Sequence, residues 1–211
     1  MGAWKEIGRM ETILSVEHLM ISFSQYERGW RKIQLPVIRD LSINIKGHEI
    51  VAVVGSSGSG KSLLAHAVMG LLPANASWKG RIAFKGEELT GKRVGELRGR
   101  QRVLVPQSVS YLDPLMKVGD QVRRGHKDGI SRARSREVLG RYGLGEDTEE
   151  LYPFQLSGGM TRRVLISTAV MEKPELVIAD EPTPGLHISA AKRVLSHFRE
   201  IADGGAGVLL I

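Results

Sequence analysis

The chain has 211 residues, a mass of 23.2 kDa and a formal net charge of +7; 42% of its residues are hydrophobic and 25% are charged. This composition fits a globular protein of one or two domains with a buried core, and it excludes the disordered and fibrous classes. The lack of cysteine excludes disulfide frameworks and thiolate chemistry, and no apolar stretch approaches the roughly 20 residues of a membrane-spanning helix.

The positive charge is concentrated in one segment. Residues 92–141 contain 13 basic and 5 acidic residues, a net of +8, and the rest of the chain has 17 basic and 18 acidic residues, a net of −1. Such a segment is typical of a solvated helical face, or of a docking face for nucleic acid, an acidic partner or a membrane assembly. Aromatic side chains that would stack on single-stranded nucleic acid are scarce there.

The first predicted elements are two strands. The alternation of apolar and polar residues in Ile13–Phe23 and Val37–Ile45 is typical of half-buried strands. The polar segment Gln25–Pro36 between them is predicted to form a hairpin loop. The chain is therefore expected to begin with an antiparallel β subdomain.

A buried strand, a glycine loop and a helix follow. Ile50–Val54 is a short apolar run, typical of a strand that is covered on both faces. Lys61–Leu72 has apolar residues on one helical face and stops at Gly70 and Pro73. Three more apolar runs predict central strands: Val103–Val105, Leu176–Ala179 and Val208–Ile211. The predicted fold class is α/β, with a mainly parallel sheet and helices on its faces.

Two helical regions are predicted in the second half of the chain. Gln107–Pro153 is rich in arginine, glycine and helix-forming residues and poor in strand signals, which indicates a helical insertion between central strands. Thr161–Glu172 has apolar residues at helical spacing. We found no internal repeat in the sequence.

The glycine loop carries the most specific motif. It satisfies the pattern G-x-x-x-x-G-K-[ST] between a strand and a helix, where it binds nucleotide phosphates through backbone N–H groups and the helix dipole. We expect Lys61 to neutralise the β- and γ-phosphates and Ser62 to ligate Mg²⁺. The predicted nucleotide-binding residues of this loop are Gly55, Ser57, Gly58, Ser59, Gly60, Lys61 and Ser62.

Two acidic residues follow the strand Leu176–Ala179. In open α/β sheets, ligands bind at the carboxyl ends of the strands. Asp180 is therefore a candidate to hold Mg²⁺ through its water shell, and Glu181 a candidate to orient or deprotonate an attacking water. Alone, such a pair is more typical of a surface turn; beside a phosphate-binding loop it indicates a catalytic site.

A second helix start is also a possible anion site. Leu156–Met160 reads Leu-Ser-Gly-Gly-Met and precedes the helix predicted over Thr161–Glu172. Helix N-termini bind anions, but by its spacing alone the segment is equally an N-cap with flexible glycines.

In this order and spacing, the three motifs resemble the Walker A, signature and Walker B motifs of the ATP-binding cassette (ABC) ATPases. The match covers nearly the whole chain. The resemblance implies ATP and Mg²⁺ as ligands and a single cassette, with a P-loop NTPase core over about 11–106 and 157–211 and a helical subdomain over about 107–156.

The resemblance also implies roles for single residues. Gln107 matches the family's Q-loop glutamine, which contacts Mg²⁺ and the attacking water. Phe23 matches the aromatic residue that stacks on adenine, although without the family it is predicted to be a core residue. Ser157, Gly158 and Gly159 are implied to reach the γ-phosphate bound to a second cassette, identical or paralogous, in a head-to-tail dimer.

Two further segments resemble the oligopeptide, dipeptide and nickel importer branch. These are Tyr111-Leu112-Asp113-Pro114 and Tyr152-Pro153-Phe154-Gln155. The branch implies uptake of peptides or nickel through transmembrane permease subunits, with an external solute-binding protein as an indirect partner. It also implies a peripheral location on the cytoplasmic face of the cell membrane and gives the basic segment a docking role.

Three features depart from the family pattern. Arg162 stands where the family usually has glutamine, and His187 where it usually has aspartate. The family's switch histidine is expected just beyond the last strand, and the sequence ends at Ile211 without it. We therefore expect a cassette that lacks its C-terminal part, in which the missing histidine would impair turnover. At the other end, Met10 is an alternative start that would leave Met1–Arg9 as a leader.

Two alternatives to an importer ATPase stay open at this point. One is an incomplete cassette that binds ATP without efficient turnover. The other is a non-transport ABC ATPase that acts on nucleic acid, which the positive charge permits; the single cassette and short insertion disfavour it, and we expect no nucleic-acid partner. A P-loop kinase or GTPase would have no use for the signature segment.

Overall fold

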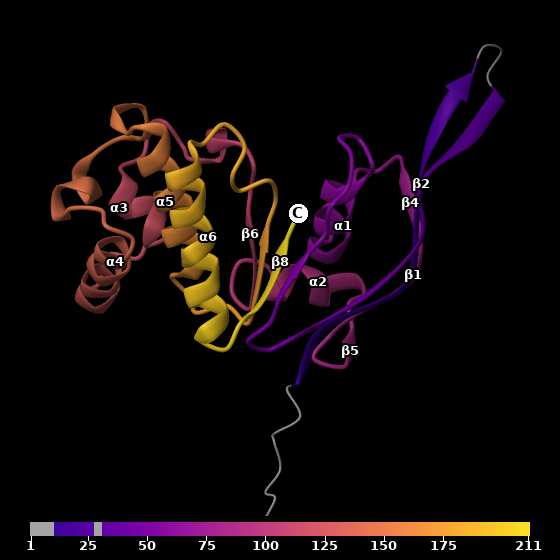
Figure 1. Cartoon of the computed structure of the whole chain (residues 1–211), viewed down its shortest axis with the longest axis horizontal. Coiled ribbons are helices and arrows are strands. Elements are labelled where there is room, and N and C mark those ends of the chain that lie inside the picture. The colour runs from indigo at the N-terminus through magenta and orange to yellow at the C-terminus, as the bar shows by residue number, and fades with distance from the viewer. Residues whose placement is uncertain (1–10, 28–30) are drawn as a thin grey trace, which may run out of the picture.

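In the computed structural model, which describes residues 11–27 and 31–211, two four-stranded sheets enclose helix α1 (Lys61–Met69) (Figure 1). Helices α5 (Gly158–Val170) and α6 (Ile188–Asp203) pack on the opposite face of the second sheet. This layered arrangement confirms the predicted α/β fold class. The leader suggested at Met1–Arg9 lies outside the described residues.

The first sheet is antiparallel, as predicted for the start of the chain. Its strand order is β2-β1-β4-β5. The strands are β1 (Thr12–Glu27), β2 (Arg31–Lys46), β4 (Ala76–Phe84) and β5 (Glu87–Glu88). The apolar residues of its inner face pack against α1 and form one of the two hydrophobic cores.

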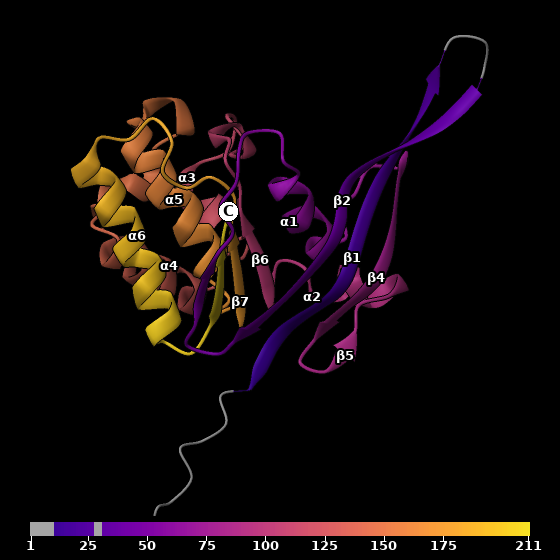
Figure 2. The same cartoon turned by 45° about the vertical axis from the view of Figure 1, so that its right-hand side comes forward.

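The prediction of a loop over Gln25–Pro36 is wrong, because both strands continue into it. Gln25 pairs with Ile33 and Tyr26 with Lys32. The strands thereby form a two-stranded ribbon that extends beyond the body of the molecule in both views (Figures 1 and 2). A ribbon that buries neither face needs no apolar alternation, so the usual sequence signal for a strand is missing.

The second sheet is parallel and has the order β3-β8-β7-β6. Its strands are β3 (Ile50–Ala52), β6 (Arg102–Val105), β7 (Leu176–Ala179) and β8 (Gly207–Leu210). Along β7, Leu176 and Ile178 belong to the core that contains α1, whereas Val177 and Ala179 belong to the core that contains α5 and α6. Both faces are therefore buried, which explains the continuous apolar run.

Two long elements, β4 and α6, were not predicted. The β4 sequence is mostly exposed in its first half and contains Gly80, so it carries only a short apolar signal. In α6, by contrast, Val194, Phe198 and Ala202 are buried at a spacing of four residues. This periodicity is present in the sequence and could have predicted the helix.

The segment between β6 and α5 is helical, as predicted. It contains α3 (Val118–Val122) and α4 (Gly129–Arg141). Short 3₁₀ turns occupy Val109–Tyr111, Glu146–Glu150 and Pro153–Gln155. This helical lobe lies on the far side of the parallel sheet from the antiparallel sheet (Figure 1). The expected boundaries of the subdomain, near residues 107 and 156, stay a prediction.

Part of the basic segment is engaged inside the protein. The side chain of Arg102 is fully buried and donates hydrogen bonds to the carbonyl oxygens of Val68 and Val94. Its guanidinium also lies 5.9 Å from the ring centre of Phe84, and burial lowers its pKa to about 10. Arg102 thus ties β6 to the end of α1 and to α2 (Gly91–Leu97).

A second internal cluster holds the helical lobe together. The Glu149 carboxylate, with 7% of its side chain exposed, accepts hydrogen bonds from Arg123 at 2.8 Å and from Arg136 at 3.2 Å. Arg123, 11% exposed, also pairs with Asp120 at 2.9 Å. These contacts connect α3, α4 and the 3₁₀ turn at Glu146–Glu150, so these charges serve the fold.

We predict that Arg123→Met destabilises the protein by about 3–5 kcal/mol, because it leaves Glu149 buried with only the exposed Arg136 as a partner. Urea denaturation measures the free energy of unfolding. The control is Arg81→Met, which breaks the half-exposed pair Arg81–Glu17 and is expected to cost less than about 1 kcal/mol. Equal losses in the two variants would contradict the assignment.

A buried histidine packs in the core beside the helical lobe. The His197 ring meets the Tyr142 ring edge to face, with centroids 4.7 Å apart and planes at 86°. Among the described residues neither ring nitrogen of His197 has a hydrogen-bond partner. Burial lowers the pKa of His197, with further lowering by Arg163, Arg193 and Arg141 and an opposing effect of Glu200.

A lowered pKa makes the unfolded chain bind the proton first, so the stability due to neutral His197 is lost as the pH falls below about 6.5. We predict that the wild-type protein loses more unfolding free energy between pH 7 and pH 5 than the His197→Phe variant does. Urea denaturation at a series of pH values measures both. Parallel curves would show that His197 does not contribute.

Candidate nucleotide-binding site

The glycine loop joins β3 to α1 in a conformation that needs glycine. Gly58 and Gly60 have φ angles of +78° and +90°, and Gly60 is the N-cap of α1. A Cβ atom on Gly60 would lie 2.8 Å from Cγ1 of Val37 and 3.3 Å from Cγ1 of Ile38. The loop is therefore pressed against β2 of the antiparallel sheet.

The contact with β2 occurs at an irregularity in that strand. Ile38 pairs with Ile21 of β1, whereas the next pair joins Pro36 to Ser22, so Val37 is an extra residue in the ladder. Such β-bulges re-aim side chains and are common next to active sites. The sequence did not reveal this role of Val37, because a bulge leaves no mark in a short alternating pattern.

Lys61 lies across its own loop. Its Nζ donates hydrogen bonds to the carbonyl oxygens of Gly55 and Ser56, each at 2.9 Å. The ammonium group is thus held at the start of the loop, close to the first turn of α1, whose N–H groups lack intrahelical acceptors. Positive charge and free donors together make this a site for anions.

The first residue pair that joins the loop to the sheet is Ser62 and Asp180. The Ser62 hydroxyl donates to Oδ1 of Asp180 at 3.0 Å. Asp180 follows β7 directly, is 7% exposed, and its N–H donates to the carbonyl of Val105 in β6. The predicted metal-binding residues of the two motifs are therefore adjacent.

A second pair joins the ends of β6 and β7. Gln107 Nε2 donates to Oε2 of Glu181 at 2.5 Å. The two residues are neighbours because β6 and β7 are paired up to Val105 and Ala179. The sequence predicted both residues but not this direct contact between them.

The backbone of Glu181 is strained. Its φ of +42° lies in the left-handed region, which costs a non-glycine residue roughly 1–3 kcal/mol. It also precedes Pro182, a position that disfavours helical conformations. Its N–H donates to the carbonyl of Ile211 at 2.8 Å, so contacts with a neighbouring strand hold it in place.

The residues at this edge suit Mg²⁺. A hydroxyl, a carboxylate and an amide converge there, and hard cations prefer such oxygen ligands. Among the described residues no group of three or more His, Asp or Glu side chains could hold a metal alone. This agrees with the usual Mg²⁺ site, in which one or two protein groups act together with phosphates and water.

The other predicted nucleotide-binding residues lie apart from this cluster. Phe23 is half-buried in β1 and pairs with Leu35. Ser157 is the N-cap of α5, where its hydroxyl accepts a hydrogen bond from the N–H of Met160 at 3.3 Å. Gly158 and Gly159 form the first turn, with open space where a Cβ would be. No hydrogen bond links these residues to the cluster within the described ranges.

The comparisons with known proteins agree with this geometry. The family model described as "ABC transporter" matches residues 38–184. The chain belongs to the ABC transporter family. This cassette is 35% identical over 206 residues to the dipeptide transport ATP-binding protein DppD of Bacillus subtilis, covering 91% of this chain and 60% of that protein. It is 34% identical to the oligopeptide transport ATP-binding protein OppD of Lactococcus lactis subsp. cremoris, covering 95% and 62%.

Solved cassettes have the same fold. The dimeric post-hydrolysis structure of the cassette MJ0796 bound to ADP and Pi has a TM-score of 0.77 and 25% identity, with 94% of this chain and 87% of that chain covered. The structure of cbiO1 from Clostridium perfringens, described as part of the ABC transporter complex cbiONQ, has a TM-score of 0.77 and 26% identity, with 95% of this chain and 78% of that chain covered. The cassette spans about 60% of the length of the curated relatives DppD and OppD.

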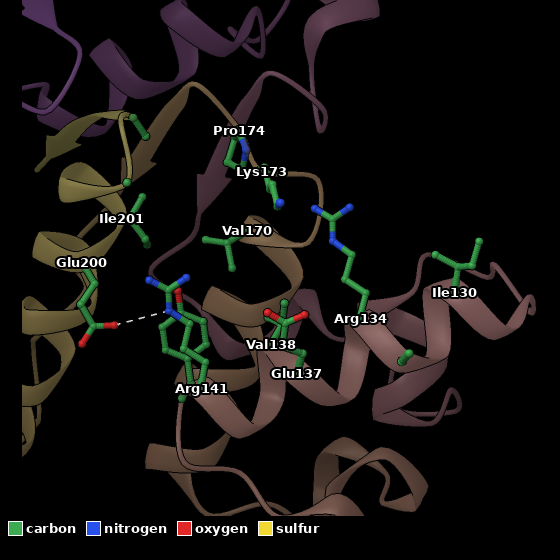
Figure 3. A pocket seen from close by; sticks show the side chains of 14 residues that line it. Ile130, Arg134, Glu137, Val138, Arg141, Val170, Lys173, Pro174, Glu200 and Ile201 are labelled. Carbon is green, nitrogen blue, oxygen red and sulfur yellow. Dashed lines mark ion pairs between the residues drawn. The ribbon is translucent and has the colours of Figure 1, made fainter.

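A separate cavity lies away from these residues. It has a volume of about 710 Å³ and is lined by α4, α6 and the segments just before β7 and β8 (Figure 3). Arg141 and Glu200 form an ion pair across it at 3.7 Å. It therefore lies at the amino end of β7, whose carboxyl end is followed by Asp180 and Glu181, and none of the predicted site residues lines it.

Within residues 11–27 and 31–211, none of the helices combines the length and the apolar character needed to cross a bilayer.

We predict that Gly60→Ala destabilises the cassette more than Gly58→Ala does. Both substitutions place an L residue at positive φ, at a cost of about 1–2 kcal/mol, but only the Cβ at position 60 meets Val37. Urea denaturation of the two variants gives the difference. Equal destabilisation would contradict the close packing of the loop on β2.

Proposed function

We propose that this cassette is the ATP-binding and ATP-hydrolysing subunit of an ABC importer for peptides. The observation that carries the proposal is the convergence of two hydrogen-bonded pairs, Ser62 with Asp180 and Gln107 with Glu181, at one edge of the parallel sheet beside Lys61. The names of the relatives DppD and OppD support peptides as the solute. Nickel uptake stays a prediction from the sequence.

Binding of the triphosphate uses the loop and the start of α1. Backbone N–H groups of residues 57–62 face the phosphates, and Lys61 exchanges its contacts with Gly55 and Ser56 for phosphate oxygens. Phe23 stacks on the adenine ring. Ser62 and Asp180 would hold Mg²⁺, which would supply neutralisation of charge on the phosphates.

Hydrolysis needs a positioned water and a base. Glu181 is the group that accepts the proton from the attacking water, and Gln107, bonded to its carboxylate, orients the side chain and the water. No covalent intermediate is required, because phosphoryl transfer depends mainly on positioning and charge neutralisation. The strained backbone of Glu181 is consistent with a residue whose carboxylate must point in one direction for catalysis.

The partners follow from the same assignment. Ser157, Gly158 and Gly159 complete the site of a second cassette in a head-to-tail dimer, and the dimeric state of MJ0796 supports this arrangement. Permease subunits anchor the pair at the cytoplasmic face of the cell membrane, and an external binding protein delivers the solute. The relatives' names, which specify transport, support the membrane partners.

The nucleic-acid alternative is weakened. It rested on the basic segment 92–141, in which Arg102 and Arg123, two of the 13 basic residues, are committed to internal contacts. The remaining alternative, binding without turnover, differs from the proposal in one measurable step.

We predict that Glu181→Gln keeps ATP binding and lowers the rate of hydrolysis by about 10²–10⁴-fold, because the amide cannot accept the proton. A fluorescent ATP analogue measures binding, and phosphate release measures turnover. A loss of binding in this variant would contradict the role of Glu181.

Lys61→Ala is the matched counterpart, since it removes the cation that faces the phosphates and is expected to abolish binding. If the wild-type protein binds ATP but releases no phosphate, the hydrolytic part of the proposal is wrong and the alternative of binding without turnover holds.

A further inference from the structure

Arg162 of α5 contacts the loop that follows β7. One guanidinium nitrogen donates to the carbonyl oxygen of Pro182 at 3.0 Å and lies 3.5 Å from that of Glu181. The other donates to the carbonyl oxygen of Pro184 at 3.1 Å. The side chain is half-buried, and this one arginine contacts three carbonyl oxygens within four residues of the loop.

The loop after β7 has few backbone N–H donors that could stabilise its conformation. Pro182 and Pro184 have no N–H group, so half of the backbone donors between Pro182 and Gly185 are missing. Within the described chain, the main-chain bond internal to this loop joins the N–H of Leu186 to the carbonyl of Thr183 at 3.2 Å. Donors must therefore come from elsewhere, and Arg162 supplies them.

The same loop begins with the strained residue of the site. Glu181 is held on its amino side by the bond from its N–H to Ile211 and at its carboxylate by Gln107. On its carboxyl side the chain enters the proline loop at once. A positive φ persists where the surrounding structure fixes the residue, and Arg162 supplies such a contact at Pro182, directly after Glu181.

An arginine suits this task better than the glutamine expected there. The carbonyls of Pro182 and Pro184 are two residues apart, and the two terminal nitrogens of a planar guanidinium reach both at once. A glutamine offers one amide group for the same two acceptors. The departure from the family pattern at position 162 thus coincides with a loop that contains two prolines.

We infer that Arg162 is a positioning residue, which fixes the loop 182–184 and through it the direction of the Glu181 carboxylate. Because α5 begins at the Ser157–Gly159 segment, Arg162 lies about one helical turn from that segment and also connects it to the loop after Glu181. The catalytic meaning of this contact rests on the proposed function; the structural contact does not.

The first test measures the loop directly. Amide hydrogen exchange, followed by NMR at Glu181 and Leu186, reports the two hydrogen-bonded N–H groups on either side of the prolines. We expect at least tenfold faster exchange at both in Arg162→Met, and a smaller increase in Arg162→Lys, which can reach one carbonyl at a time. Unchanged exchange in Arg162→Met would overturn the inference.

The matched control is Arg98→Met. Arg98 also donates two hydrogen bonds to main-chain carbonyls, those of Met69 at 3.0 Å and Gly70 at 3.1 Å, but at the distant end of α1. We expect exchange at Glu181 and Leu186 to stay as in the wild-type protein. Equal acceleration in both arginine variants would mean a general loss of stability and would overturn the specific role of Arg162.

The second test uses turnover. Arg162→Met is expected to lower kcat by about 10–100-fold with little change in KM for ATP, and Arg162→Lys to recover part of the loss. In a Glu181→Gln background, Arg162→Met should lower the residual rate no further, since the group that it positions is gone. Additive losses would overturn positioning through Glu181. If the wild-type protein lacks turnover, the proposed function fails, and the exchange experiment alone decides on Arg162.

Discussion

The burial of the parallel sheet on both faces is the constraint on which the site depends. Because β6 and β7 run in the same direction, the residues after them, Gln107, Asp180 and Glu181, leave the sheet at the same edge. The glycine loop after β3 leaves at that edge too, and Ser62 bridges it to Asp180. Packing of α1 on one face and α5 and α6 on the other keeps these strand ends in register.

Local sequence patterns made the individual motifs of the site predictable. The glycine loop lies between a buried strand and a helix, and the two acidic residues end another buried strand, so pattern and context agreed. The contacts between these motifs were beyond prediction. The bond between Gln107 and Glu181 and the packing of Val37 on Gly60 join segments far apart in the chain, and no local pattern encodes such a distance.

The errors have physical causes of the same kind. A two-stranded ribbon with both faces in solvent needs no apolar alternation, so the strands continue through the predicted loop at Gln25–Pro36. The charge of the basic segment indicated a solvent-exposed surface. Arg102 is nevertheless buried, because backbone carbonyls accept its hydrogen bonds and its guanidinium lies over the Phe84 ring. Counting charges does not show which of them have partners inside the fold.

The register of the antiparallel sheet has a separate consequence for recognition. Between Ile21 and Phe23 the β1 strand pairs regularly with β4, and the extra residue of the bulge, Val37, lies in β2. Phe23 therefore lies on the same face of β1 as Ile21, whose partner Ile38 lies next to the glycine loop. The position of the Phe23 ring relative to the glycine loop therefore depends on the number of residues between Ile21 and Phe23. Removing one residue between Ile21 and Phe23 would turn the ring to the opposite face and leave the loop untouched. Under the proposed role of Phe23 in stacking on adenine, the sheet would make recognition of the base separable from recognition of the phosphates.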